Sequence, residues 1–239
     1  MSNDSRIIIA LDNITHERAS VLSRLFSPHV AGAKVTDLID EVGVRALEGF
    51  DFGIRMADPK LHDIPVTIYN RLNKYDGYVD LVTIHASNSM EALQAAKEAS
   101  DQCKSEIKVI AVTVTTDINN DECESIFDTD CVENKVREFV SRAQTAGLHG
   151  IVCSPMEITM VRQAWPEAII ITPGIRSSDA DHHEQKRVST PYQAILDGAD
   201  YIVCGREIIQ QPTEALMIRR VHRINADVNR ALIARNKSK

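Results

Sequence analysis

The sequence lacks the cysteine spacing and the long apolar runs that mark several classes of protein. Its five cysteines are odd in number and irregularly spaced, so they predict no disulfide framework, and no CxxC or His/Cys cluster offers a zinc site. The adjacent His182 and His183 lack the spacing and partners of a metal site. No apolar run approaches the roughly 20 residues that span a bilayer, and no signal peptide is visible at the N-terminus. We therefore expect a cytoplasmic protein with no membrane partner and no metal.

A strongly basic surface is also missing. The chain of 239 residues carries a formal net charge of −7 and has no basic stripe. This balance argues against nucleic acid or an anionic membrane surface as a partner. The apolar fraction of 44% is ample for a sizeable core, and no break in composition divides the chain. We expect one domain over residues 1–239.

Apolar runs alternate with amphipathic segments along the whole chain. The β-branched run Arg6 to Leu11 is typical of a strand buried on both faces of a parallel sheet. Eight strands are expected, at residues 6–11, 30–35, 52–57, 79–86, 107–114, 150–153, 168–172 and 199–204. Helical spacing follows at residues 15–26, 37–50, 64–75, 89–100, 132–146 and 155–164, with further helices between Thr190 and about Ala234. A polar insertion, residues 117–130, joins two of these elements.

The number of these units indicates the fold. Eight strands, each followed by a helix at about thirty residues per unit, predict an α/β protein with a single-domain (β/α)8 TIM barrel. The structural alternative is a doubly wound open sheet. That alternative is disfavoured because no GxGxxG turn follows the first strand.

An acid, a base and a second acid lie within six residues at the end of the third strand. Asp58 and Lys60 point to the same side if the strand alternates regularly, and Asp63 follows near the start of a helix. A lysine between carboxylates is held protonated, which suits a group that stabilises a carbanion and then protonates it. The simpler interpretation is an exposed ion pair with Asp63 as a helix N-cap. The motif alone does not decide between them.

Polar residues also follow the other expected strands, and active sites of such barrels lie at these carboxyl ends. The ends carry Asp12, Lys34, Asp58 with Lys60, His85, Thr115 with Thr116, Ser154, Pro173 with Gly174, and Gly205 with Arg206. His85 taken alone is more typical of a structural histidine. Gly205 and Arg206 suggest a phosphate site, because glycine allows close approach and the following helix favours an anion. The polar loop 176–189, with Gln185 and Arg187, is predicted to be a lid over that phosphate.

Several motifs together resemble one enzyme family. They are IIIALD, the DxKxxDIPxxT segment 58–67, VTIHA, VTVTT, ITPGIR, the QKRVSTP run 185–191 and ADYIVCGR. In this order, from the first strand to the last, the set is similar to the orotidine 5′-phosphate decarboxylases. The resemblance implies conversion of orotidine 5′-monophosphate to UMP and CO2 in de novo pyrimidine biosynthesis. It also implies a homodimer, no metal and no organic cofactor.

The resemblance also implies a role for each matching residue. Lys60 would protonate C6 of the pyrimidine, Asp58 would lie against the substrate carboxylate, and Lys34 would complete the charge array with Asp63 of the partner subunit. Asp12 and Lys34 would hold ribose hydroxyls, Thr67 would reach the ribose across the dimer, and Thr116 would face the pyrimidine edge. Pro173, Arg176, Gln185, Gly205 and Arg206 would bind the substrate, with Gln185 and Arg206 on its phosphate.

The chain departs from the family pattern at two positions, and three alternatives stay open. Thr36 stands where glycine is common and Thr116 where serine is common. The nearest alternative is a Mg2+-dependent sugar-phosphate decarboxylase or aldolase of the same superfamily, although Lys34 and Ile64-Pro65 disfavour it. The others are a non-catalytic phosphate-binding barrel and an aldolase that uses Lys60 as a Schiff-base nucleophile.

Overall fold

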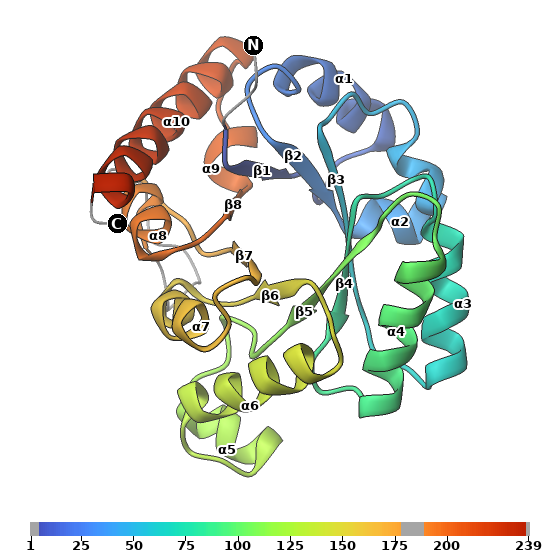
Figure 1. Cartoon of the computed structure of the whole chain (residues 1–239). Coiled ribbons are helices and arrows are strands. Elements are labelled where there is room, and N and C mark those ends of the chain that lie inside the picture. Colours follow the sequence, from blue (N-terminus) through green and yellow to red (C-terminus); the bar gives the residue numbers. More distant parts are fainter. Residues whose placement is uncertain (1–4, 178–188, 238–239) are drawn as a thin grey trace.

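Eight parallel strands close into a barrel in the computed structural model, which describes residues 5–177 and 189–237 (Figure 1). The strands follow one another around the barrel in sequence order, and β8 pairs with β1 to close it. The strands are β1 (Ile7–Ala10), β2 (Gly32–Val35), β3 (Ile54–Leu61), β4 (Leu81–His85), β5 (Lys108–Val112), β6 (Gly150–Val152), β7 (Ile169–Thr172) and β8 (Tyr201–Cys204). The predicted (β/α)8 barrel is confirmed.

The helices form a ring outside the barrel (Figure 1). They are α1 (His16–Phe26), α2 (Asp37–Val42), α3 (Pro65–Tyr75), α4 (Met90–Gln102), α5 (Asn120–Phe127), α6 (Val132–Thr145), α7 (Ile158–Ala164), α8 (Pro191–Asp197), α9 (Arg206–Ile209) and α10 (Glu214–Lys237). Two short 3-10 turns, η1 (Val44–Leu47) and η2 (Pro155–Glu157), follow α2 and β6. Among the described residues, no helix is both long and apolar enough to cross a membrane.

Side chains of each strand contribute to two separate apolar layers. Ile8 packs inside the barrel, whereas Ile7 and Ile9 on either side of it pack outward against the helices. The inner layer contains Ile8, Met56, Leu81, Ile110 and Ile171. Because both faces of the sheet are covered, the strands are mostly apolar rather than alternating regularly with polar residues. The barrel is therefore filled at its centre, which leaves its rims for function.

One local prediction was wrong, and one segment contains a helix that the sequence did not predict. The segment 37–50, expected to be one helix, is divided into α2 and η1 by Gly43, whose φ of 78° is unfavourable for other residues. The insertion 117–130, for which the sequence predicted no secondary structure, contains α5. This helix begins with a capping box in which Asn119 accepts from the Glu122 backbone and Glu122 accepts from the Asn119 backbone.

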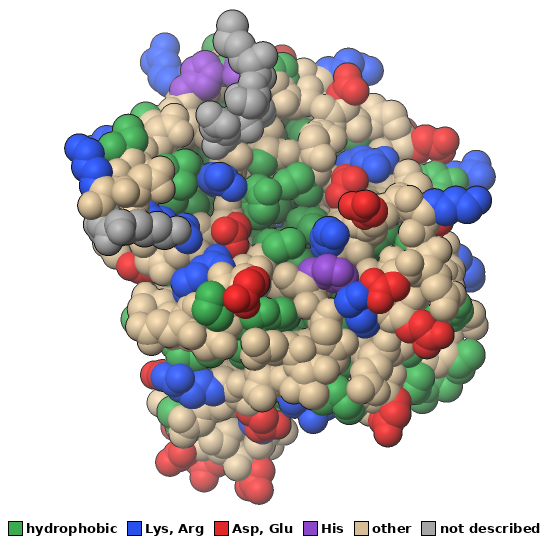
Figure 2. Space-filling view, in the orientation of Figure 1, with side chains coloured by type: hydrophobic (Ala, Val, Ile, Leu, Met, Phe, Trp, Pro, Cys, Tyr) green, Lys and Arg blue, Asp and Glu red, His purple; other side chains and the backbone are tan. Residues whose placement is uncertain are grey.

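Charged side chains of both signs are interspersed on the face of the molecule shown in Figure 2. Lysine and arginine (blue) lie next to aspartate and glutamate (red), and neither sign forms a continuous stripe on this face. This pattern agrees with the net charge of −7 and with the absence of a basic stretch in the sequence.

Candidate active site

The strand ends enclose a cavity of about 300 Å³ with a charged wall and an apolar wall. Lys34, Asp58 and Lys60 form the charged side, while apolar side chains of β3, β5, β6 and β8 form the rest. Its lining also includes the polar residues Thr115, Thr116, Asp117 and Ser154. A cavity of this kind suits a flat, partly apolar ring that carries a charged group at one edge.

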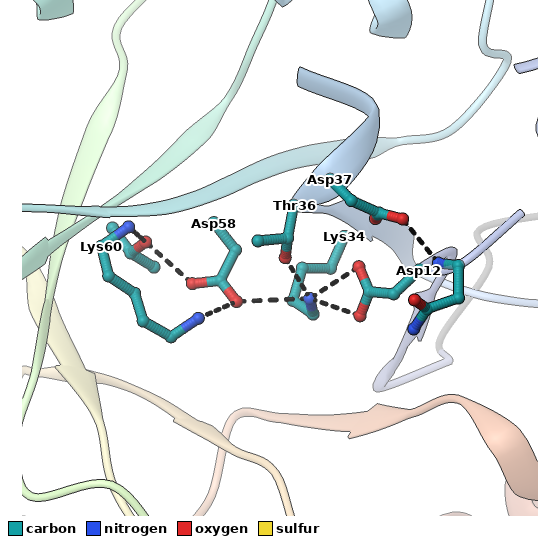
Figure 3. Close-up of polar contacts among 8 residues, drawn as sticks. Asp12, Lys34, Thr36, Asp37, Asp58 and Lys60 are labelled. Carbon is teal, nitrogen blue, oxygen red and sulfur yellow. Dashed lines mark hydrogen bonds and ion pairs between the residues drawn. The ribbon is translucent and has the colours of Figure 1, made fainter. Parts of the chain in front are cut away.

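Asp58 lies at the centre of a row of alternating charges (Figure 3). Its Oδ2 accepts from Nζ of Lys60 at 2.8 Å and lies 3.2 Å from Nζ of Lys34, and its Oδ1 accepts from the hydroxyl of Thr83 at 2.8 Å. The residue is only 7% exposed. Burial alone would raise the pKa of Asp58, but the ammonium groups of Lys34 and Lys60 outweigh it and hold the pKa below its usual value. Asp58 is therefore a buried carboxylate ion.

Lys34 continues the row on the other side of Asp58. Its Nζ donates to Oδ1 and Oδ2 of Asp12, at 3.1 and 2.8 Å, and to Oγ1 of Thr36 at 2.8 Å. Burial would lower the pKa of Lys34, but the carboxylates of Asp58 and Asp12 outweigh this and raise it. The cluster thus holds Lys34 as a cation inside the protein.

A distorted strand brings Lys60 to Asp58. β3 runs through the motif to Leu61, with a shift of register against β4 between Ala57 and Leu61. Lys60 has a φ of 44°, an unfavourable conformation for a non-glycine residue. Strain of this kind persists where the surrounding structure enforces it, and it is common at functional sites. Here the side chain of Lys60 reaches Asp58 through a bulge rather than through regular alternation.

Thr83 holds this distorted segment, and the sequence prediction missed it. Its Oγ1 accepts from the backbone N–H of Lys60 at 2.9 Å while its hydroxyl donates to Asp58. The residue is fully buried at 0% exposure. A hydroxyl inside the apolar run 79–86 was the available signal, because a buried polar side chain in a strand needs a partner.

Asn88 performs a similar task in the next loop and was also missed. Its side-chain amide donates to the carbonyl groups of Leu61 and His85, both at 2.8 Å, and its oxygen accepts from the backbone of Asp63 at 3.0 Å. The amide therefore ties the end of β3 to the end of β4. Its place in a polar stretch of the sequence offered no signal of this role.

The structure places Asp63 and Thr67 apart from the charge row. Asp63 is exposed, and its Oδ1 accepts from the backbone of Ile64 at 2.8 Å. The residue that precedes α3 is Ile64, which makes no side-chain cap, so the alternative of Asp63 as the N-cap is wrong. Thr67 lies in the first turn of α3 and is half-buried.

His85 is a structural histidine in its contacts. Its Nδ1 lies 2.7 Å from the hydroxyl of Ser87, and its ring packs edge-on against Phe139 and His62. Burial, followed by the nearby charges of His62 and Lys60, lowers the pKa of His85. It is therefore expected to be neutral beside the cationic Lys60 at neutral pH.

A second cavity, of about 440 Å³, adjoins the first at Lys34, Pro173 and Val203. Its lining includes the predicted substrate-binding residues Asp12, Pro173, Arg176, Gly205 and Arg206. A Cβ atom at Gly205 would lie 3.2 Å from Cβ of Ala10, so glycine relieves a close approach between β8 and β1. Gln185, together with residues 178–188 of the predicted lid, lies outside the described residues.

The described residues contain no group of three or more His, Cys, Asp or Glu side chains arranged to hold a metal ion. The carboxylates of the cluster are already paired with ammonium groups, which compete with a cation for the same oxygens. The chemistry that this arrangement offers is electrostatic and acid–base, supplied by the side chains themselves.

The barrel and the charge row at its carboxyl end define a (β/α)8-barrel enzyme with a lysine–carboxylate site. The chain belongs to the orotidine 5′-phosphate decarboxylase / HUMPS family, whose model matches residues 5–221.

Named relatives show which members of this family the chain resembles in sequence. The chain is 36% identical over 222 residues to orotidine 5′-phosphate decarboxylase of Dichelobacter nodosus, covering 90% of this chain and 96% of that relative. It is 37% identical over 223 residues to the enzyme of the same name from Nitrosococcus oceani, covering 91% and 96%. Among solved structures, orotidine 5′-phosphate decarboxylase from Lactobacillus acidophilus matches with a TM-score of 0.75 and 24% identity, over 94% of this chain and 99% of that one. The structural match supports the fold; the sequence matches confirm the family.

Proposed function

We propose that this protein decarboxylates orotidine 5′-monophosphate to UMP and CO2 in pyrimidine biosynthesis, without a metal or organic cofactor. The observation that carries the proposal is the row of alternating charges Lys34, Asp58 and Lys60 at the wall of a cavity that is otherwise largely apolar. Membership of the family and the names of the relatives support the same substrate.

Lys60 is the proposed acid. Loss of CO2 from C6 leaves an electron pair in the plane of the pyrimidine ring, where the π system cannot delocalise it. A fixed positive charge close to C6 then lowers the energy of the transition state, and its effect is strongest where water is excluded. Nζ of Lys60, held 2.8 Å from Asp58, supplies that charge and afterwards gives its proton to C6.

Four residues on the linings of the two cavities orient the substrate in this proposal. Asp58 faces the carboxylate that is lost, and Lys34 with Asp12 holds the ribose hydroxyls. Thr116 faces the edge of the pyrimidine. The position of all four residues on the linings of the two adjoining cavities supports these roles.

The second cavity is the proposed phosphate site. Arg176 and Arg206 provide positive charge on its lining, and Gly205 lets a ligand approach the backbone. Binding energy from a phosphate far from C6 is available to organise the charge row, so it lowers the barrier as well as the dissociation constant. The proposed phosphate contact of Gln185 stays a prediction, because that residue is outside the described part of the chain.

We also propose a homodimer in which Asp63 and Thr67 enter the partner's site. Two large apolar side chains beside them, Ile64 at 62% and Val66 at 58% exposure, support an interface here. Sedimentation of the wild-type protein tests this proposal, and a monomer at working concentrations contradicts it.

Turnover of orotidine 5′-monophosphate in the presence of EDTA, followed by the loss of substrate absorbance, tests the reaction. We expect rapid conversion to UMP by the wild type and at least about a thousandfold loss of kcat in Lys60→Ala, because both the fixed charge and the proton donor are removed. Lys97→Ala is the matched control, since Lys97 pairs with Asp101 on the outer helix α4. It should keep wild-type kcat.

Other outcomes identify the alternatives. Activity on a keto-sugar phosphate that requires Mg2+, with none on orotidine 5′-monophosphate, would assign the chain to the neighbouring branch of its superfamily. Ligand binding without turnover would indicate a non-catalytic barrel. Borohydride trapping of a carbonyl substrate on Lys60 would indicate a Schiff-base aldolase.

A further inference from the structure

Thr36 uses its hydroxyl differently from the other hydroxyl residues that precede helices. Thr15, Ser89 and Thr190 each accept a hydrogen bond from a backbone N–H in the first turn of α1, α4 and α8. Thr36 holds the same position before α2 but makes no such cap. Its Oγ1 accepts instead from Nζ of Lys34 at 2.8 Å. A contact that stabilises helices elsewhere in this protein is thus replaced by a contact to the charge row.

The contact with Thr36 completes the coordination of the Lys34 ammonium. An ammonium group has three N–H donors, and the described partners of Nζ are three residues, namely Asp12, Asp58 and Thr36. The two carboxylates keep the group charged, and the neutral hydroxyl fixes the direction of the remaining donor. Because Lys34 is only 8% exposed, a missing partner would not simply be replaced by bulk water.

The residue next to Thr36 fixes the other half of the Lys34–Asp12 pair. Oδ2 of Asp37 accepts from the backbone N–H of Asn13 at 2.7 Å. Asn13 directly follows Asp12 and has a φ of 57°, so this bond holds a backbone conformation that asparagine tolerates but does not favour. Figure 3 shows the hydroxyl of Thr36 beside the Lys34 ammonium, and the carboxylate of Asp37 beside the backbone that follows Asp12. Two consecutive residues at the start of α2 therefore orient both partners of one ion pair.

We infer that Thr36 is a positioning residue, which keeps the Lys34 ammonium directed at Asp58 and thereby keeps Asp58 in contact with Lys60. This inference rests on the proposed function, because its main effect is measured in turnover. Thr36 is absent from the described linings of the two cavities. Its loss should therefore change the rate of the chemical step more than the binding of nucleotide.

Thr36→Val and Thr36→Ser test the inference as a pair. Valine keeps the branched shape without the acceptor, whereas serine keeps the acceptor. We expect Thr36→Val to lower kcat by about tenfold to a hundredfold, the range for a displaced catalytic group. Its dissociation constant for UMP should rise by a smaller factor than kcat falls, because Lys34 also contacts the ribose in the proposed function, and Thr36→Ser should restore kcat to within about threefold. If Thr36→Val folds poorly, Thr36→Ala carries the same expectation.

Thr213→Val is the matched control. Oγ1 of Thr213 accepts from the backbone of Leu216 at 3.3 Å, at the start of α10 outside the barrel. Thr213→Val should lower the Tm of the protein and leave kcat unchanged. An unchanged kcat in both Thr36→Val and Thr36→Ala, with an active wild type, would overturn the inference and leave the proposed function standing.

A second measurement separates the inference from the reaction. NMR of protein labelled with ¹⁵N-lysine follows exchange of the Lys34 ammonium protons with water, with the signal assigned by its loss in Lys34→Arg. We expect faster exchange in Thr36→Val than in the wild type or Thr36→Ser. Equal exchange in the three proteins overturns the inference, whereas an inactive wild type with the expected exchange pattern contradicts only the proposed function.

Discussion

The two ends of the barrel use the same kinds of charged residue in different ways. At the amino end, Asp80, His149 and Asp200 directly precede β4, β6 and β8. Each accepts from the backbone N–H of the second residue of the preceding strand: Arg55 at 2.7 Å, Val109 at 3.0 Å and Ile170 at 2.9 Å. At the carboxyl end, by contrast, the described contacts of Asp58 are all with side chains, those of Lys60, Thr83 and Lys34.

This difference separates stability from function. A carboxylate bound to a backbone N–H is part of the strand ladder and cannot move without breaking it. A carboxylate held by ammonium and hydroxyl groups can exchange partners when a charged substrate arrives. The amino end is therefore expected to contribute to folding and the carboxyl end to chemistry, as in barrel enzymes generally. Substitutions at the two ends should separate these effects.

The largest effect is expected for Asp58→Asn. The amide keeps the size of the carboxylate and a contact with Thr83, but it removes the negative charge between Lys34 and Lys60. We expect kcat/KM to fall at least about a thousandfold, since the site loses the charge that positions its acid. The free energy of unfolding should also fall, because the buried ammonium of Lys34 loses one of its two carboxylate partners. Steady-state kinetics and urea unfolding measure the two effects; near-normal kinetics would remove Asp58 from the mechanism.

Arg206→Ala should have the next largest effect. The side chain belongs to the lining of the proposed phosphate cavity and not to the charge row. We expect kcat/KM to fall about a hundredfold with an unchanged Tm, since binding energy of the phosphate is lost. Arg230→Ala, which removes an exposed pair with Asp227 on α10, is the control and should be neutral. A wild-type kcat/KM in Arg206→Ala would place the phosphate elsewhere.

Asp200→Ala tests the opposite end. Its carboxylate accepts from the backbone of Ile170 and from Arg162 at 2.6 Å, and the substitution leaves a buried N–H without its partner. We expect the free energy of unfolding to fall by about 2 kcal/mol, with kcat per folded molecule unchanged. Asp80→Ala should behave in the same way, because Asp80 makes the equivalent contacts with Arg55. A fall in kcat as large as that of Asp58→Asn would contradict the assignment of folding to the amino end and of chemistry to the carboxyl end.

The sequence predicted the regular parts of both ends and missed their irregular parts. The eight apolar runs were sufficient for the barrel, because a strand covered on both faces is mostly apolar. The bulge at Lys60 was missed, since a period of two residues cannot show where the register shifts. The role of Thr83 was missed because it depends on Lys60 and Asp58, which only folding brings to it. Thr36 lies two residues from Lys34, but nothing in the sequence shows that its hydroxyl binds the ammonium rather than the start of α2. The proposed contribution of Asp63 across a dimer depends on a second chain and stays a prediction.

His149 should show the smallest effect, as a dependence of stability on pH. Burial, and then the positive charges of Lys108 and Lys97, lower the pKa of His149 to about 4 from 6.5. The unfolded chain therefore binds more protons than the folded chain between pH 6.5 and 4, and stability falls as the pH falls through this interval.

The charge row contributes to stability over a wider range of pH. The lowered pKa of Asp58 means that its contribution is lost only as the pH falls below 3.8, and the raised pKa of Lys34 means that its contribution is lost only above pH 10.5.

The free energy of unfolding of the wild type, measured with urea, should thus be lower at pH 5 than at pH 7. His149 should account for about 1 kcal/mol of this difference, after allowance for solvent screening. His149→Asn keeps an acceptor for the Val109 N–H but does not titrate, so the difference should shrink. It should not vanish, because burial also lowers the pKa of His85 and of His29. If the difference is undiminished in His149→Asn, the pH dependence belongs to His85 and His29. His149 would then contribute its hydrogen bond with the Val109 N–H to stability, but no dependence on pH.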